Sequence, residues 1–137
     1  RHSYPLICES GEFVVNLPTC RLARAVDWCG VKSGRDVDKF AAMHLTPLPA
    51  QQVSCPLVAE SPVNLECRVF QRIPLGSHDL FLADIVAIDV DEELLDAAGR
   101  LQLEKADLLA YAHGDYYALG RRLGSFGWTV RKKKPRR

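Results

Sequence analysis

The stretch that decides the fold is Asn64-Leu-Glu-Cys-Arg-Val-Phe-Gln-Arg-Ile73, followed by Pro74-Leu-Gly-Ser77 and the run Leu80 to Val90. The first run alternates between two faces, as a half-buried β-strand does. Its apolar face carries Leu65, Cys67, Val69 and Ile73, and its polar face carries Glu66, Arg68 and Arg72. Pro-Leu-Gly-Ser predicts a turn, so the two runs form a β-hairpin. Leu80 to Val90 is apolar on both faces, which predicts a strand covered on both sides, in a barrel or at a subunit interface.

Shorter β-type segments lie on either side of this hairpin. Glu12 to Asn16 predicts a strand that begins after Gly11 and stops at Pro18. Leu108 to Ala112 predicts the last strand, and Thr46 to Pro56, with three prolines, predicts an irregular connection. Glu92 to Ala98 predicts a helical turn closed by Gly99. The chain is therefore expected to be rich in antiparallel strands.

Two short helices are predicted between the first strand and the irregular connection. Thr19 is the expected cap of a helix over Cys20 to Cys29, which Gly30 ends. Ser33-Gly34 is expected to open the second helix. With these helices, the predicted fold class is mainly β, of the α+β type, with antiparallel strands and two or three short helices.

Length and composition fit one folded domain. The chain has 137 residues, of which 47% are hydrophobic and 26% charged, the usual balance of a globular protein. We expect a domain over residues 1–130 and a basic tail over 131–137. The longest unbroken apolar run is Leu108 to Ala112, far short of the roughly 20 residues that span a bilayer. No Gly-x-Gly-x-x-Gly follows a predicted strand, which excludes a Rossmann unit built by this chain.

The charge is unevenly distributed. The tail from Arg131 to Arg137 holds six of the 18 basic residues, which leaves 12 basic against 17 acidic residues in the rest, a net charge of −5. Such a body is not suited to gripping a polyanion, so nucleic acid is not the expected partner. A nucleic-acid-binding module acting through the tail stays open as an alternative, and deletion of Lys132 to Arg137 tests it.

The five cysteines point to a reducing, cytoplasmic setting. Cys8, Cys20, Cys29, Cys55 and Cys67 are odd in number and scattered, and no two form a C-x-x-C pair. This pattern argues against a disulfide scaffold and against a structural zinc site. The four histidines show no pattern of metal ligands, so no metal is expected.

Several segments together resemble one known family. They are Arg1-His-Ser-Tyr4, Glu9 to Asn16, Cys29 to Phe40, Ser61 to Cys67, the Gly76 to Phe81 turn, and Asp115 to Gly120. Their order and spacing are similar to those of the flavin reductase-like family, and most of all to its flavoredoxin-like branch. The likeness extends over nearly the whole chain. In the turn, Ser77 stands where Asp is common in the family, and Asp84 where Gly or Glu is more usual.

The resemblance implies a fold and an activity. The fold would be an FMN-binding split β-barrel, with the N-terminal strands of that barrel absent from this chain. The activity would be that of an FMN-binding oxidoreductase which takes a hydride from NADH or NADPH and passes electrons to a flavin, a protein or another acceptor. A homodimer is also implied. Without a Rossmann unit, the nicotinamide donor would bind only transiently.

The residue chemistry agrees with a site for a flavin phosphate. Arg1 and Ser3 offer a forked cation and a hydroxyl, which suit a dianion with three acceptor oxygens. Ser33 and Gly34, as a helix start, would add free N–H groups, and Lys39 lies one turn further on. The expected cofactor-binding residues are therefore Arg1, Ser3, Ser33, Gly34 and Lys39.

One residue is a candidate for the redox centre itself. Similar proteins have a histidine at the hairpin turn near the flavin, so His78 is the candidate here, with no general acid or base required. A solvent-exposed turn histidine is the alternative. The rival to the whole assignment is a truncated, non-catalytic split-barrel protein that acts as a dimeric binding module.

Overall fold

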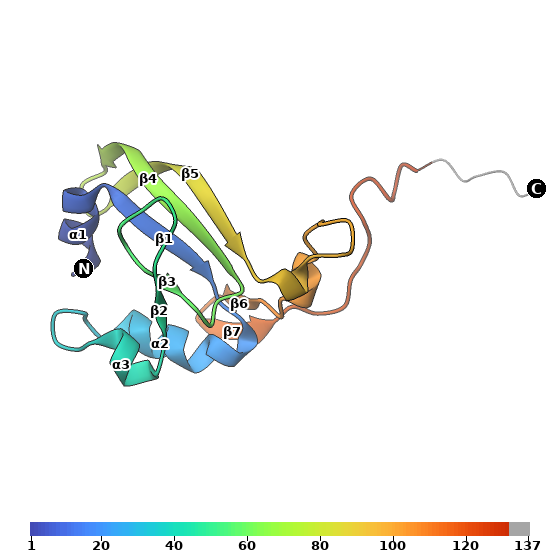
Figure 1. The fold of residues 1–137 in the computed structure, drawn as a ribbon, viewed down its shortest axis with the longest axis horizontal. Helices are drawn as coiled ribbons and strands as arrows, with labels where there is room; N and C mark the ends of the chain where they lie inside the picture. Colours follow the sequence, from blue (N-terminus) through green and yellow to red (C-terminus); the bar gives the residue numbers. More distant parts are fainter. Residues whose placement is uncertain (132–137) are drawn as a thin grey trace, which may run out of the picture.

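A long antiparallel hairpin dominates the fold (Figure 1). In the computed structural model, which describes residues 1–131, strands β4 (Val63–Pro74) and β5 (Asp79–Val90) pair along their length. Strand β1 (Glu12–Leu17) pairs antiparallel with the first half of β4, from Glu12 opposite Arg68 to Leu17 opposite Val63. The sheet has the order β1-β4-β5. The predicted hairpin and the predicted first strand are confirmed.

The pairing of β4 with β5 has two irregularities. The register shifts between Glu66 and Cys67, where Val86 of β5 has no partner, and again between Val69 and Gln71, where Phe70 of β4 has none. A bulge interrupts the alternation only in the strand that carries the extra residue, so β4 alternates regularly from Val63 to Val69. Glu66, predicted on a polar face with Arg68, is 0% exposed, while Arg68 is exposed. Glu66 and Arg68 lie on one face, as predicted, and both contact Gln52. The burial of Glu66 was not predicted: its carboxylate accepts from backbone N–H groups of residues 51–53.

The proline-rich connection contains a small second sheet. Strands β2 (Pro47–Leu48) and β3 (Leu57–Val58) pair antiparallel. Between them runs an irregular loop over residues 49–56. The predicted irregular connection is therefore confirmed for this loop, with two short strands at its ends.

Three α-helices precede this second sheet. Helix α1 (Ser3–Ser10), which the sequence did not predict, ends at Gly11, whose φ of 68° suits glycine. A 3-10 turn, η1 (Cys20–Leu22), leads into α2 (Ala23–Val31). The predicted helix over Cys20 to Cys29 therefore starts late and runs past Gly30, and Thr19 makes no side-chain cap. The third helix, α3 (Lys39–Met43), begins five residues after Gly34.

The C-terminal third of the described chain is built from short elements. They are the 3-10 turns η2 (Glu92–Leu94) and η3 (Leu103–Lys105) and the hairpin strands β6 (Leu109–Ala112) and β7 (Asp115–Ala118). The prediction that Leu108 to Ala112 is the last strand was wrong, because β7 follows it. The turn between the two strands has positive φ at His113 and Gly114, the geometry of a tight two-residue hairpin. The predicted helical turn is shorter than expected, since η2 ends at Leu94.

The buried core is small and lies where the sheet meets the C-terminal turns. Val63, Leu94 and Ala106 form its centre, and Leu17, Leu65, Val90 and Leu108 pack against it. Outside the core, β5 exposes large apolar side chains: Leu80 is 46% exposed, and Ile85 and Ile88 are each 55% exposed. The strand predicted to be covered on both sides is thus open on part of its surface in the single chain.

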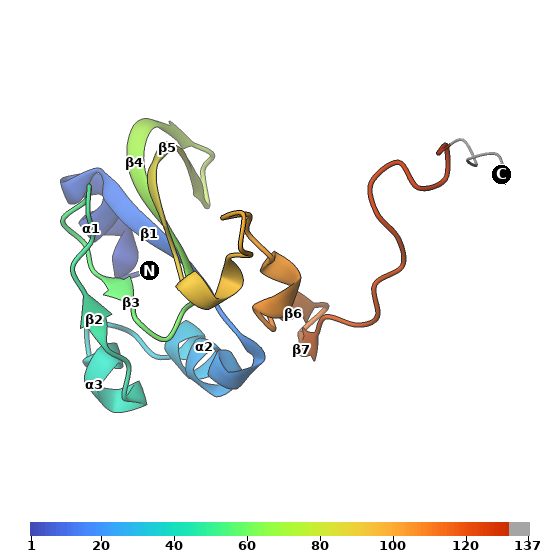
Figure 2. The same cartoon turned by 45° about the vertical axis from the view of Figure 1, so that its right-hand side comes forward.

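Helices α2 and α3 lie on the side of the molecule opposite the β4–β5 turn (Figures 1 and 2). Helices α2 and α3 are below the sheet in both views, while the β4–β5 turn is at the top, next to α1 (Figures 1 and 2). Across residues 1–131, no helix is long and apolar enough to cross a membrane. The basic tail proposed as a nucleic-acid contact lies, from Lys132 on, outside the described residues. The mainly β class with short helices is confirmed.

Candidate functional site

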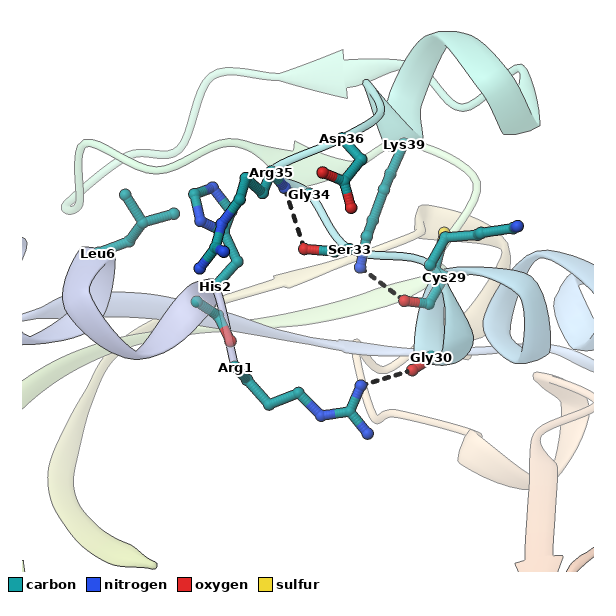
Figure 3. A pocket seen from close by; sticks show the side chains of 12 residues that line it. Arg1, His2, Leu6, Cys29, Gly30, Ser33, Gly34, Arg35, Asp36 and Lys39 are labelled. Atoms are coloured by element: carbon teal, nitrogen blue, oxygen red, sulfur yellow. Dashed lines mark hydrogen bonds between the residues drawn. The ribbon is translucent and has the colours of Figure 1, made fainter.

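A cavity of about 650 Å³ opens between the start of the chain and the segment that joins α2 to α3 (Figure 3). We call it the polar cavity. It is lined by Arg1, His2, Ser3, Leu6, Cys29, Gly30, Lys32, Ser33, Gly34, Arg35, Asp36 and Lys39.

The polar cavity contains every residue that the sequence predicted for cofactor binding. Arg1 and Ser3 reach it from the chain start, and Ser33, Gly34 and Lys39 reach it from the α2–α3 segment. These two segments are about 30 positions apart in the sequence, and the fold brings them together around one space.

Two cations of the cavity are held by the end of α2. Arg1 donates from Nη1 to the carbonyl oxygen of Gly30 at 3.2 Å, and Lys39 donates from Nζ to the carbonyl oxygen of Cys29 at 2.6 Å (Figure 3). Carbonyls in the last turn of a helix lack helical partners and attract cations. A guanidinium carries five N–H donors and an ammonium three, so both side chains keep donors for a ligand.

The segment Ser33-Gly34 is a turn, and the prediction that it opens a helix was wrong. The backbone N–H groups of Asp36 and Val37 donate to the Ser33 carbonyl, and Ser33 Oγ accepts from the N–H of Arg35 at 3.2 Å. The helix cap is Asp38, which has extended backbone angles and accepts from the N–H of Ala41 at 3.2 Å. Ser33-Gly34 therefore offers no helix N-terminus to an anion, and the charged donors of the polar cavity are side chains.

Gly34 allows a close approach between the two segments. A Cβ at this position would lie 3.2 Å from Cδ2 of the His2 ring and 4.0 Å from Cε of Lys39. The first distance is shorter than an ordinary van der Waals contact between carbon atoms. The absence of a side chain at Gly34 thus lets His2 lie against the turn.

The charge of the polar cavity is strongly positive. Four of its lining side chains are cationic, namely Arg1, Lys32, Arg35 and Lys39, and Asp36 is its single acid. Such a set favours an anion with more than one negative charge. Sequence reasoning missed His2, Lys32 and Arg35, although each is a neighbour of a residue it selected.

An apolar cavity of about 760 Å³ adjoins the polar one. The two share Ser3, Leu6, Cys29 and Lys39 in their linings. Most of the other lining residues of this apolar cavity are hydrophobic: Ile7, Phe13, Val14, Phe40, Leu45, Cys55, Pro56 and Val58. The pair of cavities therefore offers a charged end and an apolar end to one amphipathic ligand.

His78 lies apart from both cavities. It sits on the exposed connection between β4 and β5, where its Nδ1 is 3.0 Å from Ser77 Oγ. It is absent from the linings of the polar and the apolar cavity. In this chain alone the structure does not bring His78 to the residues selected for cofactor binding.

A polar network fastens α1 to the hairpin. Tyr4 donates its hydroxyl to Asp79 at 2.9 Å and accepts from Arg72 Nη1 at 3.2 Å. Arg72 also forms an ion pair with Asp79 at 3.4 Å. The hydrogen bond to Asp79 raises the pKa of Tyr4, so the phenol remains a donor. This network fixes the helix whose first residues line the polar cavity.

The described residues contain no group of three or more His, Cys, Asp or Glu side chains arranged to hold a metal ion. The five cysteines are free thiols. Burial raises the pKa of the Cys20, Cys55 and Cys67 thiols, which keeps them protonated.

Comparison with protein families gives a match over most of the chain. The family described as flavin reductase like domain matches residues 1–120. An uncharacterised protein of Archaeoglobus fulgidus is 38% identical over 88 residues, which cover 64% of this chain and 50% of the relative. The chain spans about half the length of the curated relatives that it matches first, 50% and 55%.

Solved structures share the fold. Flavoredoxin of Desulfovibrio vulgaris (Miyazaki F) superposes with a TM-score of 0.87 at 32% identity, over 95% of this chain and 70% of that chain. An FMN-binding protein from Thermus thermophilus, solved with bound 1-cyclohex-2-enone, gives a TM-score of 0.73 at 25% identity, over 91% of this chain and 67% of that one. The predicted split-barrel fold class is confirmed by these neighbours.

Proposed function

Because the chain belongs to the flavin reductase-like family, we propose that it is an FMN-binding oxidoreductase that accepts a hydride from NADH or NADPH. Electrons then pass to a flavin, a protein or another acceptor. The observation that carries this proposal is the convergence of Arg1, Ser3, Ser33 and Lys39 on one cation-rich cavity that adjoins an apolar one.

The polar cavity has the donors that the FMN phosphate requires. A phosphate monoester carries close to two negative charges and three acceptor oxygens at neutral pH. Arg1 and Lys39 supply charge and N–H donors, and Ser3 and Ser33 supply hydroxyls, all within one lining. Hydrogen bonds between a charged donor and a phosphate are about twice as strong as neutral ones. These residues would hold the phosphate end of the cofactor.

The apolar cavity suits the ring end of the same molecule. Flat ring systems are bound in clefts lined mainly by hydrophobic side chains with a few polar groups. Phe13, Phe40 and Leu45 provide such a surface, and Asn16 is among the few polar groups there. When bound, FMN supplies the hydride-accepting ring, while the protein provides binding, orientation and exclusion of water.

A homodimer in a cytoplasmic setting completes the proposal. Ile85 and Ile88 are exposed on one face of β5, opposite Cys67 and Leu65, and Leu80 is exposed near its start. A second copy would cover apolar side chains of this kind. The outer edge of β5 is unpaired in this sheet and would also gain a partner there. Five free thiols fit a reducing compartment.

The test of the proposed function is whether the protein binds FMN and uses it. The purified protein is titrated with FMN, followed by the quenching of flavin fluorescence, and NADH and NADPH are then added with an electron acceptor. The proposal predicts saturable FMN binding and FMN-dependent oxidation of one nicotinamide. Absence of FMN binding would refute the assignment and favour the dimeric binding module, which no longer holds flavin. FMN binding without any oxidation of NADH or NADPH would refute the proposed hydride transfer.

A further inference from the structure

We propose that Glu66 is a positioning residue that holds the wall of the apolar cavity in place. Its carboxylate fixes the loop over residues 51–54, and this loop leads directly into Cys55 and Pro56, which line that cavity. The importance of this role for the flavin ring rests on the proposed function, whereas the effect on the loop does not.

Both carboxylate oxygens of Glu66 accept hydrogen bonds from backbone N–H groups of the loop. Oε1 accepts from the backbone N–H of Gln51 at 2.7 Å, and Oε2 accepts from those of Gln52 at 2.6 Å and Val53 at 3.1 Å. The side chain is 0% exposed. A buried charge is stable only where hydrogen bonds replace water, and here three backbone donors do so. Burial by itself raises the pKa of Glu66, but these bonds outweigh it and leave the pKa below its ordinary value.

A second carboxylate, that of Glu12, binds the next residue of the loop, Ser54. Glu12 on β1 accepts from both the N–H and the hydroxyl of Ser54, each at 2.8 Å. Arg68 forms an ion pair with Glu12 at 3.6 Å and donates to the carbonyl of Gln52 at 2.8 Å. Four successive backbone N–H groups, from Gln51 to Ser54, therefore end on two carboxylates of the sheet.

This arrangement explains how an irregular loop keeps one conformation. Loop backbone groups normally bond to water, which allows many conformations. Here the consecutive N–H groups converge on fixed anions, as in the backbone nests that bind phosphate. The side chain of Gln51 adds a further anchor, because its Nε2 donates to Asp89 on β5 at 2.6 Å. The loop is thus tied to β1, β4 and β5.

The anchored loop ends where the cavity wall begins. Cys55 and Pro56 follow Ser54 directly, and β3 starts at Leu57, where its pairing with β2 closes the loop. Val58 is held by Asn16, whose Oδ1 accepts its N–H at 3.0 Å. The wall residues therefore lie between a paired strand on one side and the carboxylate-bound N–H groups on the other. Loss of Glu66 releases one of these two supports.

The first experiment measures, without any ligand, how accessible Cys55 in the cavity wall is to a thiol reagent. In Glu66→Gln, one acceptor oxygen is replaced by an amide that faces backbone donors, so the loop loosens and Cys55, which is half-buried, becomes more accessible. Burial and, to a smaller extent, the Glu66 charge raise the pKa of the Cys55 thiol, so alkylation by iodoacetamide is followed over a range of pH by peptide mass spectrometry. The plateau rate at high pH, where the thiol is fully ionised, should be about tenfold faster than in the wild type. Cys67, buried on β4, reports on global unfolding and should remain protected.

Two further variants make the result specific. Glu12→Gln loosens the same loop from a less buried position, so it serves if Glu66→Gln does not fold. Glu60→Gln is the matched control, because Glu60 also accepts a backbone N–H, that of Thr46 at 3.0 Å, but lies outside both cavities. Cys55 alkylation should be unchanged in Glu60→Gln.

The second experiment compares the affinities of two ligands, one with the flavin ring and one without it. FMN would fill both cavities, whereas D-ribose 5-phosphate has the phosphate and no ring. Glu66→Gln should weaken binding of FMN by about tenfold and leave that of D-ribose 5-phosphate unchanged, since a displaced wall affects the ring alone. A general loss of stability would weaken both ligands alike.

The outcomes are distinguishable. Unchanged Cys55 alkylation in folded Glu66→Gln and Glu12→Gln, or equal losses for both ligands, would overturn the positioning role. Faster alkylation together with a wild-type protein that binds neither ligand would support the loop assignment and refute the proposed flavin site.

Discussion

Two places in this molecule gather several hydrogen-bond donors, and they differ in what the donors face. At the loop over residues 51–54, backbone N–H groups bind the protein's own carboxylates, Glu66 and Glu12. In the polar cavity, side chains such as Arg1 and Lys39 surround open space with an excess of positive charge.

The difference separates a structural anion site from a candidate binding site. In the loop, each donor has an acceptor within the chain, so the contact fixes the backbone and leaves nothing for a ligand. In the polar cavity, Arg1 and Lys39 each make one bond to a helix-end carbonyl and keep their remaining donors. Variants at the loop should therefore affect stability first, and variants in the cavity should affect ligand affinity first.

The largest expected effect is on the loop side. Glu66→Ala leaves three backbone N–H groups without their acceptor, that of buried Val53 among them, and creates a void, so we expect the free energy of unfolding to fall by about 3 kcal/mol. Urea denaturation followed by circular dichroism measures it. A loss below about 1 kcal/mol would show that the carboxylate contacts contribute little.

Acid should weaken the same contacts to a smaller extent. Hydrogen bonds lower the pKa of Glu66 and of Glu12 below the ordinary 4.5, so their stabilisation is complete above that pH. It is lost as pH falls through the lower pKa of the folded state. The urea midpoint should drop below pH 4.5, and the drop should be smaller in Glu66→Gln. An identical pH profile in that variant would contradict this explanation.

On the cavity side, the expected effect is on affinity. Arg1→Ala and Lys39→Ala should each weaken FMN binding by about 1–3 kcal/mol, the loss of a charge-assisted contact to phosphate. The free energy of unfolding should stay within about 0.5 kcal/mol of the wild type in Arg1→Ala, since Arg1 is exposed, and should fall by about 1 kcal/mol in Lys39→Ala, which loses a part-buried hydrogen bond. Fluorescence titration and urea denaturation measure the two quantities. Unchanged FMN affinity in both variants would mean that the phosphate lies elsewhere.

The smallest expected effect concerns the helix that carries Lys39. Asp38 caps α3, and Asp38→Ala should lower the free energy of unfolding by about 1 kcal/mol. Because a frayed first turn lets Lys39 move, FMN affinity should also fall by a few fold. Asp38→Asn, which keeps a capping oxygen, should restore both, and failure to do so would implicate the charge of Asp38 instead.

The sequence predicted the sheet well because its signals are local. The alternation over Asn64 to Ile73 and the turn residues after it specify a hairpin without information from distant parts of the chain. The same alternation placed Glu66 on the face of Arg68 but could not show its burial, which depends on backbone N–H groups 13 to 15 positions away.

The helical region was predicted less accurately. Ser33-Gly34 has the composition of a helix start, but Asp38 competes for the same role and takes it, because its carboxylate reaches the N–H of Ala41. Helix α1 has no side-chain cap and was missed. The selected residues nonetheless share the polar cavity. Arg1 and Ser3 were selected on charge, hydrogen-bonding chemistry and family resemblance, whereas Ser33, Gly34 and Lys39 were selected on a helix start that the structure does not have.

The most direct test of the central claim compares FMN with riboflavin, which has the same ring and lacks the phosphate. If the polar cavity binds the phosphate, the wild type should bind FMN about tenfold or more tightly than riboflavin, and the double variant Arg1→Ala/Lys39→Ala should bind the two with nearly equal affinity. Equal affinities in the wild type, or a preference for FMN that persists in the double variant, would contradict the account.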